Sequence, residues 1–350
     1  MCRTKSIWYN FISCAAVAVI CLGTPSNSIA QKTDILTLRN GDVITGEIKS
    51  LNRNKLEFST PRMSTVYIEW QEIARINSSK VFQVELITLD LIVVTLGVSE
   101  EDGVLQVTQD GVKRTYAMSE ITEMTRLKGT FFSRLKATVQ LGGNVVKAND
   151  ERTYNFDGSL QYRSSKILSN ATLSSYLSAQ AGRDANQTNK ARYSLNRLLK
   201  HGWGAGGNAQ FESNDELNLE SRINVGLSAS KSIIQSNIIL FYAFVGLQSN
   251  SEKFSTAPET LTSAEAVGST TFEYFKFRNP DIDLSISASV YPSITEEDRV
   301  RANINGRISY EVISDLDLSL NGYFDWDSRP APGSPKNDYG FFTSIGYSFN

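Results

Sequence analysis

The sequence has few of the residues on which covalent cross-linking and metal binding usually depend. It contains three cysteines and one histidine. The cysteines, Cys2, Cys14 and Cys21, all lie close to the N-terminus. No disulfide framework or thiolate metal site is therefore expected in the rest of the chain. We predict no cofactor-binding residues and no metal site.

Catalytic patterns are also absent. No HExxH, GxSxG, Walker or EF-hand pattern occurs. The single histidine, His201, lies in LLKHGWG, which we predict to be a short turn. A lipid-modifying enzyme would need its histidine paired with a nucleophile or an acid. We expect His201 to be a solvated turn residue, predict no catalytic residues, and predict that the protein is not an enzyme.

A strong charge of one sign and long hydrophobic runs are missing as well. The formal net charge is −2, which argues against nucleic acid as a partner. No stretch beyond the N-terminal segment reaches the roughly 18 apolar residues that mark a membrane-spanning helix. Any membrane span in this chain would have to be made of strands.

The N-terminal segment, residues 1–30, is predicted to be a secretory signal peptide. Arg3 and Lys5 precede an apolar run over 15–22, and the small residues Ser28 and Ala30 precede the expected cleavage site. A lipoprotein anchored at Cys21 is a poorer alternative, because Ile20 stands where a small residue should be.

Residues 31–128 are predicted to form a periplasmic tandem β-repeat domain, with repeats over about 35–80 and 81–128. The stretch LEFSTPRMSTVYIEWQEIARI can be laid over LQVTQDGVKRTYAMSEITEM, which pairs Glu72 with Glu120 and Ile73 with Ile121. Upstream, NG at 40–41 lies between two β-rich runs and is a strong hairpin signal. We expect two small SH3-like or Sm-like units.

Beyond residue 133 apolar and polar side chains alternate through long segments. Leu135, Ala137 and Val139 share one face of a predicted strand, and Lys136 and Thr138 share the other. These segments run about 10 to 12 residues, longer than the usual 5 or 6 of globular sheets and suited to a tilted strand crossing a bilayer. We predict an all-β fold in which residues 133–350 form a transmembrane antiparallel β-barrel of about 12 strands. The alternative is a soluble β-sandwich.

Connection lengths favour the barrel. Long connections, such as the one predicted over 248–263, alternate with short ones such as 164–166 and 314–315, and an inner connection is also predicted over 230–236. Outer-membrane barrels have short periplasmic turns and longer outer loops. Aromatic residues near strand ends are expected at the membrane interfaces: Trp203, Tyr291, Phe324, Trp326, Phe341 and Phe349.

The segments LKATVQLGGNVVKANDERTYNFDGSLQYRSS and ELNLESRINVGLSAS carry a resemblance to a known family. From about residue 133 to 350 the chain resembles the salt-induced outer-membrane proteins, also described as the DUF481 family. The resemblance implies an outer-membrane protein of a Gram-negative bacterium, with no settled mechanism and no functional residues to carry over. It does not extend to the N-terminal repeats.

Charged side chains on the polar face of the alternation are the remaining candidates for function. They are either an internal salt-bridge network or the lining of a weakly selective pore or polar-solute site. The candidate lumen-lining residues are Lys136, Asp157, Arg163, Arg192, Glu212, Glu220, Arg222, Glu273, Asp283, Arg307, Glu311, Asp317 and Asp325.

We predict a non-enzymatic outer-membrane β-barrel, a porin-like narrow pore or a solute-binding channel, with its N-terminal domain in the periplasm. The alternative is a structural protein that anchors a module for a periplasmic protein or cell-wall partner. Expected partners are outer-membrane lipid and the barrel-assembly machinery, and not nucleic acid.

The last strand yields the first testable prediction. Phe349 is the last aromatic residue and is expected to act as the sorting signal, with Asn350 a tolerated extension. Phe349→Ala should reduce the amount of folded protein in the outer membrane more than deletion of Asn350 does. Membrane fractionation followed by immunoblotting measures this. Equal effects of the two changes would contradict it.

Overall fold

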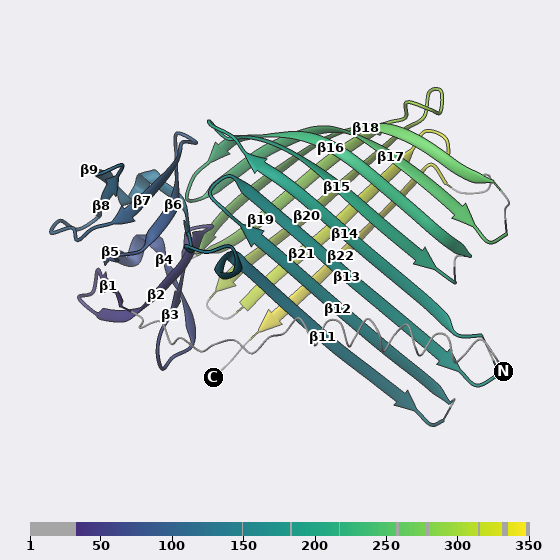
Figure 1. The fold of residues 1–350 in the computed structure, drawn as a ribbon, viewed down its shortest axis with the longest axis horizontal. Helices are drawn as coiled ribbons and strands as arrows, with labels where there is room; N and C mark the ends of the chain where they lie inside the picture. The colour runs from purple at the N-terminus through teal and green to yellow at the C-terminus, as the bar shows by residue number, and fades with distance from the viewer. Residues whose placement is uncertain are drawn as a thin grey trace.

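The computed structural model describes residues 33–148, 150–182, 184–216, 218–256, 259–277, 280–313, 316–330 and 335–347 (Figure 1). The predicted signal peptide and Phe349 lie outside these residues. The strands form one sheet of ten and one of twelve strands. Three short 3-10 turns accompany them: η1 (Trp70–Glu72), η2 (Met118–Glu120) and η3 (Phe132–Arg134). Within the described ranges, no helix is long and apolar enough to cross a membrane.

The ten-stranded sheet consists of two units with the same strand order. Hydrogen bonding gives β4-β3-β2-β1-β5 for the first and β9-β8-β7-β6-β10 for the second, and β10 pairs with β2 to join them. We call this part, residues 34–126, the module. Its strands are β1 (Asp34–Leu38), β2 (Val43–Asn52), β3 (Lys55–Ser59), β4 (Thr65–Glu69), β5 (Ile73–Asn77), β6 (Val81–Leu86), β7 (Leu91–Leu96), β8 (Val104–Gln109), β9 (Val112–Ala117) and β10 (Ile121–Arg126).

The two units share one hydrophobic core. The turns η1 and η2 occupy equivalent places between the last two strands of each unit. Trp70 of η1 is buried, and its indole Nε1 donates a hydrogen bond of 2.6 Å to the carbonyl of Met118 in η2. Fully buried Phe58 and Phe82 bring one large ring from each unit into the core. This packing makes the module a single body, while its resemblance to SH3-like folds stays a prediction.

The second sheet confirms the prediction of twelve antiparallel strands. Each strand pairs with its sequence neighbours, in the order β11 to β22. The strands are β11 (Leu135–Val146), β12 (Glu151–Arg163), β13 (Ile167–Gln180), β14 (Asn186–Leu198), β15 (Trp203–Asn214), β16 (Leu219–Gln235), β17 (Ile239–Phe254), β18 (Thr260–Phe277), β19 (Asp281–Pro292), β20 (Val300–Ile313), β21 (Leu316–Asp327) and β22 (Asn337–Tyr347).

The expected pairing of the last strand with the first is not seen. Within the described residues β11 pairs only with β12, and β22 only with β21. The sheet is strongly curved, so that β19 to β22 pass behind the earlier strands in the view of Figure 1, and the module lies at one end of the strands. It is one continuous curved sheet, which contradicts the sandwich alternative.

Several strands extend beyond the predicted 10 to 12 residues. β16 has 17 residues, β17 has 16 and β18 has 18. The connections predicted over 230–236 and 248–263 are therefore wrong in extent: β16 runs to Gln235 and the β17–β18 ladder includes the pair Lys253 and Thr260. Clusters of polar residues in these segments indicate loops when the sequence is considered alone. In the structure these residues pair across neighbouring strands; Glu252, for example, is the partner of Arg222.

The twelve-stranded sheet has two chemically different faces. Its register shifts occur only near strand ends, as between Glu212 and Asn214. Because directly paired residues point to the same side and successive residues to opposite sides, one apolar face and one polar face run across all twelve strands. Of the large apolar side chains described in this sheet, only Leu219 and Phe275 are fully buried. The core of the molecule lies in the module, and the sheet has none.

Candidate functional site

The polar face of the twelve-stranded sheet carries the charged residues singled out from the sequence. Following the ladder from Lys136 on β11, paired with Gln161, to Asp325 on β21 assigns each residue to a face. One face holds Lys136, Asp157, Arg163, Arg192, Glu212, Arg222, Glu273, Asp283, Arg307, Glu311, Asp317 and Asp325.

Glu220 departs from this pattern. The register shifts between Leu219 and Ser221, so Glu220 lies in a bulge. Its Oε2 is 2.6 Å from Nζ of Lys253. Lys253 directly follows Glu252, which pairs with Arg222 on the polar face, so it belongs to the opposite face. The prediction that Glu220 points inward is therefore wrong, because a bulge reverses the alternation that the sequence suggests.

Tyr291 also differs from its expected place. It pairs directly with Arg301, and the Arg301 guanidinium carbon lies 5.5 Å from the centre of its ring. It therefore belongs to the polar face rather than to an aromatic band on the apolar one. Trp203 and Phe341, by contrast, are exposed on the apolar face.

A network of ion pairs gathers near the end of the sheet that lies away from the module, which we call the loop end. Arg222 donates from Nε to Glu252 at 2.8 Å and from Nη1 to Glu212 at 3.2 Å. Lys190 lies 3.1 Å from Glu212 as well. Each carboxylate is thus held by cationic donors through charge-assisted hydrogen bonds.

Two further arginines complete this network. Arg301 forms a two-pronged pair with Glu265, with Nη2 to Oε2 at 2.6 Å and Nε to Oε1 at 3.1 Å. Arg299 donates to Glu296 at 3.0 Å and to Asp327 at 2.7 Å. Glu212 and Glu265 are almost fully buried. Charge-assisted hydrogen bonds therefore cross-link these strands and the connection that carries Glu296 at the loop end.

The network surrounds a cavity of about 630 Å³ on the polar face. This volume lies within the range of about 300 to 1,000 Å³ typical of small-molecule sites. The cavity is lined by Arg222, Asn224, Gln248, Asn250, Glu252, Leu261, Thr262, Ser263, Glu265, Glu296, Arg299 and Arg301.

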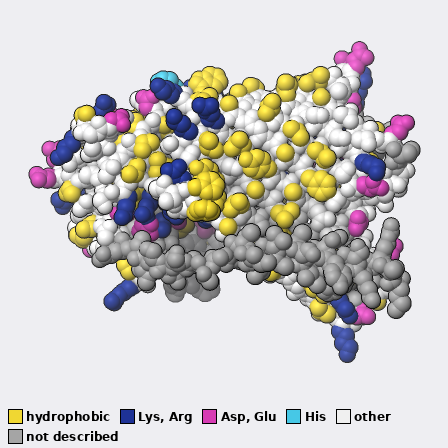
Figure 2. Space-filling view, in the orientation of Figure 1, with side chains coloured by type: hydrophobic (Ala, Val, Ile, Leu, Met, Phe, Trp, Pro, Cys, Tyr) yellow, Lys and Arg dark blue, Asp and Glu magenta, His cyan; other side chains and the backbone are white. Residues whose placement is uncertain are grey.

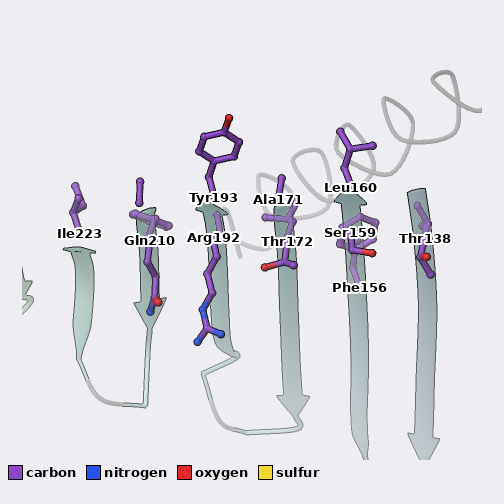
Figure 3. A pocket seen from close by; sticks show the side chains of 16 residues that line it. Thr138, Phe156, Ser159, Leu160, Ala171, Thr172, Arg192, Tyr193, Gln210 and Ile223 are labelled. Atoms are coloured by element: carbon purple, nitrogen blue, oxygen red, sulfur yellow. The ribbon is translucent and has the colours of Figure 1, made fainter. Parts of the chain in front are cut away.

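A second hollow of about 640 Å³ lies across β11 to β16 and has a different character. Figure 3 shows Leu160, Ala171 and Tyr193 pointing to one side of these strands, and Arg192 and Gln210 pointing to the other. The hollow thus lies on strands whose apolar side chains point to one side and whose polar side chains point to the other. Its apolar lining suits hydrocarbon rather than a polar ligand.

The apolar face is widely exposed. Figure 2 shows hydrophobic side chains spread over the middle of the twelve-stranded sheet, with charged side chains towards the two ends. Leu141 is 65 % exposed, Leu227 72 % and Ile345 73 %. Exposed apolar patches on monomers in water seldom exceed a few hundred Å². A face of this extent needs an apolar environment.

The module docks at the opposite end of the sheet, where the connecting turns are short. The tip of the β2–β3 hairpin turns through Arg53 and Asn54, both with positive φ, which is the backbone of a tight hairpin turn. Arg53 then reaches the polar face: its Nη2 is 2.7 Å from Asp283 and its Nε 3.2 Å from Glu273. Its guanidinium carbon lies 4.8 Å from the ring centre of Phe275, which is fully buried.

Further contacts spread this docking over several turns of the sheet. Gln83 donates to the carbonyl of Ser165 at 2.6 Å, between β12 and β13. Asn237, between β16 and β17, donates to the carbonyl of Ser119 at 3.3 Å. His201, between β14 and β15, lies 3.2 Å from Asp90. His201 is largely exposed in a turn, as expected, but it faces the module rather than a nucleophile.

A pair of carboxylates lies within the same junction. Glu85 on β6 is the register partner of Glu123 on β10, and Arg163 of β12 donates to Glu123 at 3.3 Å. Burial raises the pKa of Glu85 to about 7, and the charge of Glu123 adds to this rise. A hydrogen bond with Gln235 and the charge of Arg163 oppose it. Glu85 therefore titrates near neutral pH and keeps its proton in mildly acidic solution.

The junction residues were missed by reasoning from the sequence. The NRNK turn around Arg53 is a visible hairpin signal. Nothing local indicates that Arg53 meets Glu273 and Asp283, because more than two hundred residues separate them. In the described part of the chain no cluster of three or more His, Cys, Asp or Glu side chains could hold a metal ion.

A comparison with protein-family models agrees with the resemblance noted from the sequence. A family model described as a protein of unknown function, DUF481, matches residues 139–349. No curated protein matches the chain. A solved structure titled as a bacterial polysaccharide outer membrane secretin is similar with a TM-score of 0.37 and 12% identity, over 77% of this chain and 97% of that one.

The junction carboxylate leads to a prediction about pH. Glu85 retains in the folded state a proton that an unfolded chain loses near pH 4.5. The stability of the module should therefore fall as pH rises from 4.5 through 7, by up to about 3 kcal/mol. Glu85→Gln, which stays neutral, should remove this fall. The melting temperature of the module between pH 5 and 8, followed by the fluorescence of Trp70 in a background with Trp203 and Trp326 replaced by Phe, measures it.

Glu101→Gln, at an exposed glutamate of the module, is the matched control and should leave the pH dependence as in the parent protein. The assignment fails if the parent and Glu85→Gln show the same pH profile.

Proposed function

The chain belongs to the DUF481 family, and from this premise we propose that it is a non-enzymatic outer-membrane β-barrel protein whose interior admits small polar solutes. The observation that carries the proposal is the twelve-stranded sheet with one continuous exposed apolar face and one continuous charged face. The apolar face would contact outer-membrane lipid, and the charged face would line the interior.

The size of the apolar face supports lipid contact. Burying one Leu, Val or Phe side chain is worth about 1.5 to 3 kcal/mol, while the net stability of a domain is only about 5 to 15 kcal/mol. Side chains such as Leu227, Leu247 and Phe341 leave well over half their surface exposed, and many like them lie across the sheet. Contact with hydrocarbon would remove the free-energy cost of exposing these side chains to water, and no second layer of protein would be needed.

Membrane insertion would require the sheet to close. Unpaired backbone groups are not tolerated in hydrocarbon, so β11 and β22 must pair with each other there. The even number of strands returns the chain to the side where the sheet begins, and both strands belong to the same strongly curved sheet. Closure through a β11–β22 ladder is thus part of the proposal.

Orientation follows from the connections. The connections at the module end, such as 164–166 and 236–238, are short, whereas 293–299 and 328–336 at the other end are longer. Short turns face the periplasm in barrels of this kind. The module would therefore lie in the periplasm, in contact with the barrel mouth. Assembly there would use the barrel-assembly machinery.

The module would also restrict the interior. Its hairpin tip places Arg53 between Glu273 and Asp283 on the polar face, and its other contacts reach three of the hairpin turns around the same end. Solutes that enter from the loop end would meet this cap. A narrow or intermittently open path is the expected result, rather than a wide pore.

A direct test measures conductance of the purified full chain in planar bilayers. We expect small, discrete conductance steps in the parent protein and larger or more frequent ones in Arg53→Ala. The change removes the ion pairs to Glu273 and Asp283 and the contact with Phe275. Arg62→Ala, at an exposed arginine of the same module, is the matched control and should behave as the parent.

Two results would overturn parts of this proposal. Silent bilayers, with folded and inserted protein shown by heat-modifiable gel migration, would exclude the solute path. Identical conductance in the parent and in Arg53→Ala would exclude the restriction of the interior by the module. The proposed solute path through the barrel would be unaffected by that result.

A second candidate function is a docking module for a periplasmic protein or the cell wall. The observation that favours it is the pair of edge strands in the module: within the described chain β4 pairs only with β3, and β9 only with β8. All but one residue of β9 is exposed, including Val112 and Lys113. An exposed sheet edge can take up an extended segment of another protein as an added strand.

This second candidate predicts a crosslinked partner. A photo-crosslinking amino acid placed at Lys113 should capture a periplasmic component in intact cells, and the same group at the exposed Glu101, between β7 and β8, should not. Crosslinking patterns that are the same at the two positions would contradict an edge-specific partner.

A further inference from the structure

The side chains that line the cavity at the loop end indicate which class of solute it can bind. Its lining includes three arginines and three glutamates, so their formal charges cancel. Each arginine is already bound to carboxylates: Arg222 to Glu252, Arg301 to Glu265 and Arg299 to Glu296. A bare anion or cation would have to break one of these pairs and leave a partly buried charge without its partner, which is costly.

Neutral hydrogen-bonding groups complete the lining. Asn250 donates from Nδ2 to Glu252 at 2.7 Å, and Gln248 from Nε2 to Glu265 at 3.0 Å. These bonds fix both amides in orientation and use one of the two N–H donors of each. Asn224 accepts a bond of 3.4 Å from Asn208 at its Oδ1. Within the described residues, Gln248 and Asn250 each keep a carbonyl acceptor and a second N–H donor, and the Nδ2 group of Asn224 is a further donor.

Acceptors and donors thus lie together in a cavity whose charges are already satisfied. Ser263, which pairs with Asn250 on the polar face, adds a hydroxyl group that can both donate and accept. A solute that fits must also carry both donors and acceptors and must be uncharged. Hydroxyl groups have both properties, and several neighbouring hydroxyls can bind several planar side chains at once.

We propose that this loop-end cavity binds a neutral polyhydroxylated solute of the size of a mono- or disaccharide. The cavity volume of about 630 Å³ suits this size class. The inference deepens the proposed function and rests on it, because the polar face must be the interior of a closed barrel reached from outside. The ion pairs act as a rigid frame, and the amides and the Ser263 hydroxyl make the direct contacts.

The test uses the full chain folded in lauryldimethylamine oxide micelles, which avoids sugar-based detergents. Saturation-transfer NMR titrations compare sucrose and maltose with gluconate, spermidine and glycine betaine as anionic, cationic and zwitterionic probes. We expect saturable binding of at least one of the two sugars, with no displacement of it by the three charged probes.

Asn224→Leu and Asn250→Leu each remove one neutral hydrogen-bonding group and keep the side-chain size. Each should weaken sugar binding about three- to ten-fold, which corresponds to one hydrogen bond. Asn170→Leu is the matched control: this asparagine is also on the polar face, on β13, but does not line the cavity. It should leave the affinity unchanged.

The outcomes separate this inference from the proposed function. Absence of saturable sugar binding, tighter binding of a charged probe, or equal weakening by Asn170→Leu overturns the cavity assignment. If conductance in planar bilayers persists in that case, the solute path survives without the site. Sugar binding by folded protein that gives silent bilayers supports the site and excludes the path.

Discussion

The twelve-stranded sheet depends on one constraint, the two-residue alternation of its paired strands, which holds through the strand interiors. Because the ladder keeps its register through the strand interiors, a side chain on one strand fixes the face of its partners on the next. This relation places Lys136 on β11 and Asp325 on β21 on the same face. The separation of apolar from charged surface, the ion-pair network and the cavity all follow from it.

Much of this could be predicted from the sequence, because a period of two is local. The twelve strands, the turn position of His201 and the polar placement of residues such as Arg222 and Glu311 are visible in the alternation itself. Where a bulge interrupts the period, as at Glu220, the prediction fails. The prediction for Tyr291 is wrong for a different reason. An aromatic ring near a strand end indicates the lipid interface, but the register places Tyr291 beside Arg301 on the polar face.

Long-range pairing is the part that the sequence does not reveal. Arg53 and Asp283 form a bond of 2.7 Å across 230 residues of chain, and nothing near either residue indicates the other. The lining of the loop-end cavity is also drawn from segments far apart, so its neutral balance emerges only when β16 to β20 are side by side. Composition alone shows charges of both signs and cannot show which of them are paired.

The docking of Arg53 also links the module to the state of the sheet. Within the described residues the strands of the module pair only with one another, so its fold does not require the sheet. The acceptors of Arg53 lie on β18 and β19, so its ion pairs can form only once these two strands are in place beside the module. The attached hairpin tip thus reports that this part of the sheet has been assembled.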